Sequence, residues 1–389
     1  MRRRDFLRQA TTMSGAALPA LAAVSGAMAL PGLAAASDGG ATQPALAAGA
    51  PAAPSKRPDP YGTIVVNGLD PSVLSREYVD MQRAAGVDCW HLSMDQLRSF
   101  ADAHNFADAN REVIRIVRSV SEIRAAKQEG RLALLLGWQD ANPLTGLRDG
   151  PNDWWSDPPR SELRAYYELG LRVCGIAYQI ANTFGGGGID GHMGLSRAGR
   201  RLVEEIHKLR IVLDVGGHTG DRASLDALAM SSGVPIIASH ANTRKFANSA
   251  RNLSDEVIDG IARTDGVIGM VAISDFVMRG KEMANVEPSP LGTVDDMLKH
   301  ADYLKKRIGA RHVGLGPDFT HGMSLNRDYA LFGAEAMDKG PRRYVQGFES
   351  ITGLPNVVAA LQRHGWTQEE LRGFLGGNWL RVYEKVWGG

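Results

Sequence analysis

Short apolar, β-rich runs alternate with longer amphipathic segments through most of this sequence. The β-rich runs cover 63–66, 87–92, 132–136, 171–177, 211–215, 234–238, 267–273 and 312–315. Segments with helical periodicity cover 75–85, 111–129, 161–169, 197–209, 221–231, 254–263 and 293–308, and further helices are expected over 353–364 and 367–387. Because each helical crossover returns the chain to the same end of the sheet, this alternation predicts parallel strands.

Eight such units in a chain of 389 residues predict an α/β fold of the (β/α)₈ TIM-barrel type in a single domain. A doubly wound open sheet is the alternative, and it predicts a glycine-rich fingerprint after the first strand. The sequence there, Asn67-Gly68-Leu69-Asp70-Pro71, lacks that fingerprint. The glycine cluster Gly185–Gly188 carries no lysine, which argues against a phosphate-binding loop.

The first 58 residues are expected to lie outside this domain. Residues 1–36 combine Arg2-Arg3-Arg4-Asp5-Phe6-Leu7 with a mildly apolar stretch and small residues at its end, which is typical of a twin-arginine signal peptide. A general secretory signal or a membrane anchor is the alternative, although the apolar stretch is interrupted by Pro19 and would span a membrane poorly. Residues 37–58 are rich in Ala, Pro and Gly and predict a flexible linker to a domain at 59–389. The pattern predicts export by the twin-arginine translocase to the periplasm or beyond.

The charge balance and the cysteine content limit the kinds of partner and of covalent bond that the sequence predicts. The 44 basic and 43 acidic residues nearly cancel, and no basic stripe points to a nucleic-acid partner. The two cysteines, Cys89 and Cys174, lie in apolar runs, where two buried free thiols are favoured over a disulfide.

Polar residues follow the predicted strands at the ends that converge on the mouth of a barrel. His218 and His240 follow neighbouring runs, in "RIVLDVGGHTGD" and "PIIASHANTR", and are candidate ligands of one divalent ion, zinc before others. A lone histidine is more often an ordinary one; the matched placement of two favours a metal. Gln139 ends another run and could supply a third ligand, as could Asp140 or Asp318.

Two charged residues complete the candidate site. Asp318, in "HVGLGPDFT", follows an apolar run and is interpreted as a general acid/base or a metal ligand, with a loop-capping aspartate as the alternative. Arg251, in "ARNLSDE", either holds an anionic group of a substrate or forms a surface ion pair.

Several stretches resemble, in order, those of the membrane (renal) dipeptidase family of zinc-dependent, amidohydrolase-like peptidases. They are the two histidine motifs, "ARNLSDE", "HVGLGPDFTHG" and the C-terminal "LGGNWLRVYEKVW". The resemblance implies a (β/α)₈ barrel with two bridged zinc ions. It assigns His218 and His240 to the second zinc, Arg251 to the substrate carboxylate and Asp318 to catalysis. Tyr178 falls where family members carry a substrate-binding histidine, and relatives are often homodimers.

The sequence departs from the family at the first zinc. The family carries a His-x-Asp motif that binds this zinc, and here Leu69 and Pro71 stand at the positions of its histidine and aspartate. Gln139 stands at the position of the family's bridging glutamate. Leucine and proline cannot bind zinc, and a neutral amide bridges two cations poorly. We therefore expect a divergent bacterial branch that holds one zinc ion rather than two.

The sequence predicts an exported metal-dependent hydrolase that cleaves a dipeptide or related small amide with a zinc-activated water. The alternative is a non-hydrolytic relative, a ligand-binding or maturation protein with a degraded metal site. Metal-independent lysis or isomerisation is a third reading of the same residues.

Overall fold

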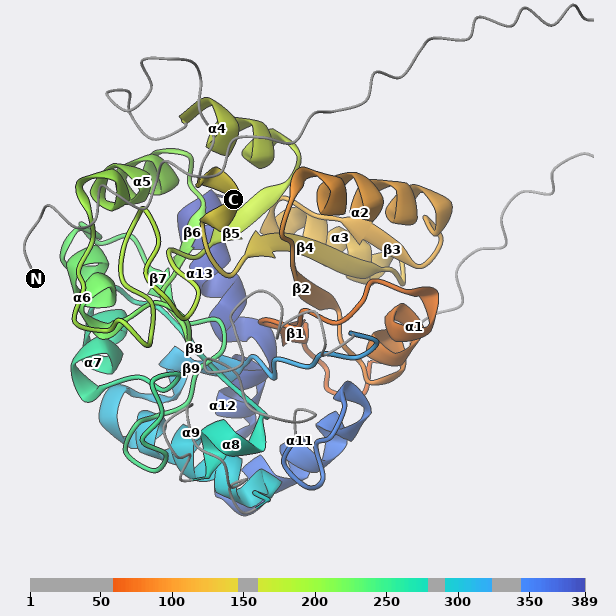
Figure 1. Cartoon of the computed structure of the whole chain (residues 1–389). Coiled ribbons are helices and arrows are strands. Elements are labelled where there is room, and N and C mark those ends of the chain that lie inside the picture. Colours follow the sequence, from red (N-terminus) through yellow and green to blue (C-terminus); the bar gives the residue numbers. More distant parts are fainter. Residues whose placement is uncertain (1–58, 146–159, 279–290, 324–343, 389) are drawn as a thin grey trace, which may run out of the picture. The chain divides into compact units, whose positions relative to one another are not determined.

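The computed structural model describes residues 59–145, 160–278, 291–323 and 344–388 (Figure 1). The predicted signal peptide and linker, at 1–36 and 37–58, lie outside the described residues. No helix in the described ranges combines the length and the apolar character that crossing a bilayer requires.

All strand pairs of the barrel are parallel, as the alternation predicts. The first six barrel strands pair in the order β1-β2-β4-β5-β6-β7, β3 pairs with β4 at its side, and β8 pairs with β9. A bridge between Ala238 and Ile268 joins β7 to β8, and the Gly68 amide donates to the Leu315 carbonyl at 2.9 Å. The strands are β1 (Val66–Asn67), β2 (Cys89–Ser93), β3 (Ile114–Ile116), β4 (Leu132–Trp138), β5 (Leu171–Cys174), β6 (Val212–Asp214), β7 (Ile236–Ile237), β8 (Ile268–Met270) and β9 (Val313–Leu315).

These links complete the ring, and the predicted (β/α)₈ fold is confirmed. Most of the helices surround the strands in Figure 1, whereas α13 runs across the middle of the ring in this view. They are α1 (Arg76–Ala84), α2 (Leu97–Ala109), α3 (Val120–Gln128), α4 (Arg160–Glu168), α5 (Arg197–Lys208), α6 (Asp221–Ala229), α7 (Asp255–Arg263), α8 (Ser274–Val277), α9 (Val294–Ile308), α11 (Leu354–Arg363), α12 (Gln368–Arg372) and α13 (Asn378–Trp387), with a π-helical turn at Gly373–Gly377 between the last two.

One predicted helix is wrong in its first half. Residues 111–129 read as a single amphipathic segment, but Ile114–Ile116 form β3, which pairs with Leu132–Leu134 of β4. The helix begins only after Ser119, whose hydroxyl accepts a hydrogen bond from the Glu122 amide and caps it. The Ile-Arg-Ile alternation is the signal for the strand. Helix α2 was not anticipated at all.

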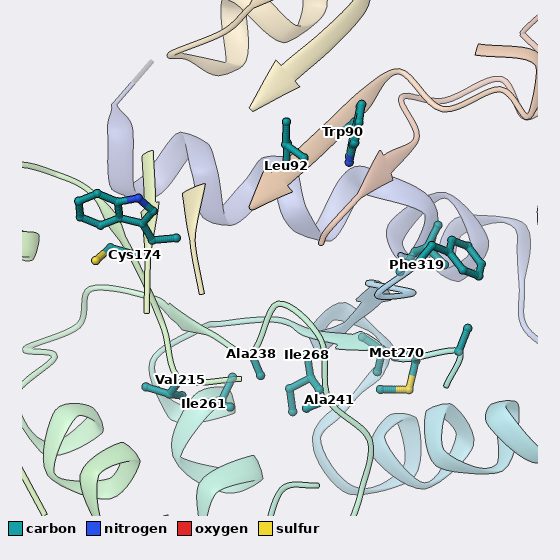
Figure 2. Close-up of a cluster of buried hydrophobic side chains, with 14 of the residues drawn as sticks. Trp90, Leu92, Cys174, Val215, Ala238, Ala241, Ile261, Ile268, Met270 and Phe319 are labelled. Carbon is teal, nitrogen blue, oxygen red and sulfur yellow. The ribbon is translucent and has the colours of Figure 1, made fainter. Parts of the chain in front are cut away.

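Two apolar layers fill the fold on either side of the strands. One layer lies between the strands and the helices; Figure 2 shows part of it, with Trp90 and Leu92 on β2, Ile261 on α7 and Met270 on β8. The other lies inside the barrel and contains, among others, Val66, Cys89, Leu135, Val173, Val212, Ile237 and Val267, together with Trp379 and Tyr383 of α13. The thiols of Cys89 and Cys174 are buried and unlinked, as predicted.

Helix α13 closes the barrel at the amino-terminal ends of the strands. The Arg381 guanidinium donates to the carbonyl of Asp265, just before β8, and the Trp387 indole donates to that of Arg172 in β5. The opposite, carboxyl-terminal ends of the strands are where the candidate site residues lie.

Candidate functional site

His218 lies between two of the predicted site residues. Its Nε2 is 2.8 Å from Oε1 of Gln139, and its ring stacks on that of Tyr178 with centroids 3.7 Å apart. The Gln139 amide is oriented from the other side, because its Nε2 donates to the Ser93 hydroxyl at 3.0 Å. An oriented amide oxygen facing an imidazole can serve as a hydrogen-bond acceptor or as a weak metal ligand.

His240 is the neighbour of His218, with ring centroids 5.0 Å apart. Its Nδ1 lies 2.7 Å from the Ser239 hydroxyl, and the Ser239 amide donates to Oδ1 of Asp214 at 2.9 Å. Burial raises the pKa of the Asp214 carboxyl to about 6, against the hydrogen bonds from Ser239 and Gly216. A partner on Nδ1 fixes the orientation of the His240 ring, as supporting groups do for metal-binding histidines.

Arg251 and Asp318 form the second part of the site. The guanidinium Nη2 lies 3.6 Å from Oδ2 of Asp318, and both side chains are almost completely buried. Arg251 also sits over the ring of Phe276, 5.0 Å from its centroid. Asp318 has a φ of 61°, in the left-handed region that few side-chain-bearing residues adopt. Such strained positions concentrate at functional sites.

Gly217 brings the two parts together. A Cβ atom at this position would lie 2.1 Å from Nη1 of Arg251 and 2.6 Å from the carbonyl oxygen of His240. The guanidinium therefore occupies the space beside the residue that precedes His218, and only glycine leaves it room. The structure thus brings Gln139, Tyr178, His218, His240, Arg251 and Asp318 to one region at the carboxyl ends of the strands.

Leu69 and Asp70, which follow β1, are held by hydrogen bonds within the protein. Leu69 is fully buried, and its carbonyl accepts from the Asp318 amide at 3.1 Å. Asp70, between Leu69 and Pro71, is buried and already surrounded by donors. Its Oδ2 accepts from Tyr78 at 2.6 Å, Asn67 at 2.9 Å and Gln82 at 3.1 Å, and its Oδ1 accepts from the Ser72 amide at 3.0 Å. The Asp70 carboxylate is therefore held by four donors from the protein itself.

Asp70 gives the fold a pH-dependent stability. Burial raises its pKa to about 6 from 3.8, although Ser72, Tyr78 and Asn67 pull it down. A raised pKa in the folded state means that protonation stabilises the fold below pH 4 and that this contribution is lost as the pH rises through 6. Between pH 4 and pH 7 we expect wild-type protein to lose up to about 3 kcal/mol of unfolding free energy relative to Asp70→Asn, measured by urea denaturation. Parallel pH curves for the two proteins would contradict this.

Few side chains that could hold a metal converge at this site. In the described ranges no three His, Cys, Asp or Glu side chains gather as a metal-binding group. What converges is two imidazoles, of His218 and His240, and the amide oxygen of Gln139. Imidazole nitrogens and an amide oxygen are donors that a zinc ion can accept in proteins.

Two residues near the site escaped the sequence interpretation. Ser93 orients Gln139, and His91, two residues earlier on β2, is fully buried with Nδ1 2.6 Å from the Gly68 carbonyl oxygen. Burial lowers the pKa of His91 to about 4, so it is neutral. The alternation Cys89, His91, Ser93 on the inner face of the barrel was the available signal.

Comparisons with known proteins identify the family of this chain. Residues 88–387 match the sequence model of the family described as membrane dipeptidase (peptidase family M19). Dipeptidase tcpJ of Claviceps purpurea is 28% identical over 294 residues, which is 74% of this chain and 56% of that protein, so the chain spans about half of that relative's length.

Solved structures share the fold. An amidohydrolase from Pseudomonas aeruginosa superposes with a TM-score of 0.73 at 24% identity, over 84% of this chain and 97% of that one. A metallopeptidase from Rhodobacter sphaeroides, solved with a phosphinate mimic of the dipeptide L-Ala-D-Ala, gives 0.65 at 21% identity, over 84% and 100%. The family match covers most of the chain, from β2 to the last helix: this protein belongs to the membrane dipeptidase family.

Proposed function

We propose that this protein is a hydrolase that cleaves a dipeptide or a related small amide bearing a free carboxylate. The observation that carries the proposal is the buried pair of Arg251 and Asp318, 3.6 Å apart and next to the segment that holds His218. A buried guanidinium suits a planar carboxylate, and a neighbouring carboxylate suits proton transfer. The family membership supports the same reaction class.

Each residue has a role in this proposal. Arg251 binds the substrate carboxylate, which competes with Asp318 for the guanidinium and thereby releases the aspartate for proton transfer. Asp318 accepts a proton from the attacking water and delivers it to the nitrogen of the leaving amine as the C–N bond breaks. The hydroxyl of Tyr178, stacked on His218, donates a hydrogen bond to the oxygen that gains charge.

A metal belongs to the proposal as a single ion. His218, His240 and Gln139 would hold it, and when bound it supplies Lewis-acid activation of water and of the amide carbonyl. Ser239 keeps the His240 ring in place, and Ser93 keeps the Gln139 oxygen turned toward His218.

Export is a further part of the proposal. The twin-arginine pattern of residues 1–36 supports passage through the twin-arginine translocase to the periplasm or the exterior. That route carries folded proteins, so a metal can be acquired before translocation. Homodimer formation, which the family resemblance suggests, stays a prediction to be tested by light scattering.

A second function is favoured by one observation, the fully satisfied Asp70 at the first metal position. With that position rebuilt as structure, the protein could be a ligand-binding or maturation protein that retains Arg251 for recognition. The two functions differ in turnover, because binding without hydrolysis leaves dipeptides intact.

Metal analysis and a substrate panel test the proposal. We expect about one zinc per chain, lost in His218→Asn and His240→Asn, since two imidazoles dominate the donor set. Cleavage of L,L- and L,D-dipeptides should stop with a chelator and return when zinc is added. The matched control is His91→Asn, which alters a buried histidine outside the proposed ligand set and should keep the metal. Full activity in metal-free protein would contradict the metal assignment, and binding without cleavage would favour the second function.

A further inference from the structure

Exposed apolar side chains concentrate in one segment next to the site. In the described ranges seven large apolar side chains are exposed, and Ile180, Ile189 and Met193 are three of them, at 47%, 45% and 45%. They lie in the connection between β5 and α5, which begins just before Tyr178. Scattered exposed apolar residues need no explanation, but three in one connection beside a candidate site do.

The backbone of this segment is fixed to the site. The Gly188 amide donates to the His218 carbonyl at 2.7 Å, and the Ile189 amide donates to the Gln179 carbonyl at 2.8 Å. Gly187 pairs with Thr219, the residue after His218. Ile189 is thus bonded to Gln179, the residue after Tyr178, while the two glycines before it are bonded to His218 and Thr219.

Further bonds hold the outer side of the segment. The Asp190 carboxylate accepts from the Ala181 amide at 2.6 Å, and the Gly220 amide donates to the Gly186 carbonyl at 2.9 Å. On the Arg251 side, a Cβ at Gly188 would lie 3.0 Å from the carbonyl oxygen of Ala250. The apolar residues are therefore presented on a fixed backbone that reaches from Tyr178 to the residue before Arg251.

We propose that Ile180, Ile189 and Met193 form an apolar subsite for the side chain of the substrate residue that carries the free carboxylate. The inference rests on the proposed function and names its substrate class: dipeptides or amides with a bulky aliphatic C-terminal residue. Arg251 would fix the carboxylate end of the substrate, and Ile189 follows Gly188, whose backbone lies beside the carbonyl oxygen of Ala250, the residue before Arg251. In this proposal the side chain next to the substrate carboxylate packs against Ile189. Because the backbone of this segment is already fixed, little conformational entropy is lost when a substrate binds.

The test compares Ala-Leu with Ala-Ala in binding and in cleavage, with zinc-loaded wild-type protein and the variants Ile189→Ser and Ile180→Ser. We expect wild type to prefer Ala-Leu about tenfold in kcat/KM and in affinity measured by calorimetry, and each variant to lose most of that preference without losing Ala-Ala. The matched control is Leu97→Ser, at an exposed apolar residue that follows β2 rather than β5; its preference should equal that of wild type.

The outcomes separate the two proposals. If Ala-Leu binds more tightly and the preference falls in Ile189→Ser, but nothing is cleaved, the subsite stands and the hydrolase proposal fails. If both dipeptides are cleaved without preference, or if the preference survives both serine substitutions, the subsite is wrong. It is also wrong if neither dipeptide binds, or if the substitutions abolish only self-association in light scattering, because the apolar residues would then contact a second copy of this chain.

Discussion

Replacement of Asp318 by asparagine should reduce kcat for dipeptide cleavage about a thousandfold, because asparagine cannot accept the proton of the attacking water. The side chain is almost completely buried and lies 3.6 Å from the Arg251 guanidinium. KM should change much less, since the guanidinium that binds the substrate carboxylate is retained. Steady-state kinetics at several dipeptide concentrations separates the two effects.

The control for this variant must distinguish lost chemistry from lost structure. Asp88 is also buried, and its Oδ2 accepts from the Val65 amide at 2.9 Å and from Lys127 at 3.0 Å, away from the site residues. Asp88→Asn should therefore lower stability while its kcat stays near that of wild type. An Asp318→Asn enzyme that is folded and keeps its full kcat would refute the role of Asp318; one that binds dipeptides as before but cleaves none agrees with it.

The barrel was predictable because its signal is repeated. Each of the eight apolar runs contributes a strand. The errors are the missed helix α2 and the boundary inside 111–129, a segment that carries two patterns. In 111–129 the second half has a helical period, and the whole segment was therefore predicted as a helix. Ile114–Ile116 instead form a strand, and the helix begins only after its N-cap Ser119. Local periodicity cannot place a boundary inside a segment when both halves are amphipathic.

The site was predictable to the extent that parallel strands share an end. His218 and His240 follow adjacent strands, and their rings do lie 5.0 Å apart. The family resemblance predicts that Leu69 and Pro71 replace two metal ligands, and this stays a prediction. The partners of Asp70 could not be predicted, because they include Tyr78 and Gln82 of α1. Whether a carboxylate binds a metal or stabilises the fold depends on its hydrogen-bond partners. Two partners of Asp70 lie on a different element, so the sequence around Asp70 could not identify its role.

Glycines gave the least readable signal. Gly185–Gly188 lack the lysine of a phosphate-binding loop, but their contacts with His218 and Ala250 could not be predicted from the sequence. A glycine matters here because another residue occupies the space that a side chain would fill. That residue can be distant in the sequence. Gly217 and Arg251 are 34 positions apart, and the guanidinium fills the place of the missing Cβ.

Glycines also make room for a large side chain of the C-terminal helix α13. We expect the largest effect on stability from replacement of that side chain. Trp379 is fully buried inside the barrel, and its indole donates to the Leu315 carbonyl at 3.2 Å. A Cβ at Gly68 would lie 2.5 Å from the indole ring and one at Gly314 2.6 Å, so glycines on two neighbouring strands create its space. The "GGNWLRV" motif therefore stabilises the barrel from within, beneath the site at its other end.

Trp379→Ala should reduce the free energy of unfolding by about 3–5 kcal/mol, because the barrel interior cannot collapse around the cavity that the indole leaves. Trp387, on the same helix, is the matched control: it is half-buried, stacks on Tyr383 and donates to the Arg172 carbonyl at 3.3 Å. Trp387→Ala should cost about 1 kcal/mol. Urea denaturation of both variants measures the difference. Equal losses would mean that the indole of Trp379 contributes only as a surface residue would, and that α13 stabilises the barrel through its outer contacts instead.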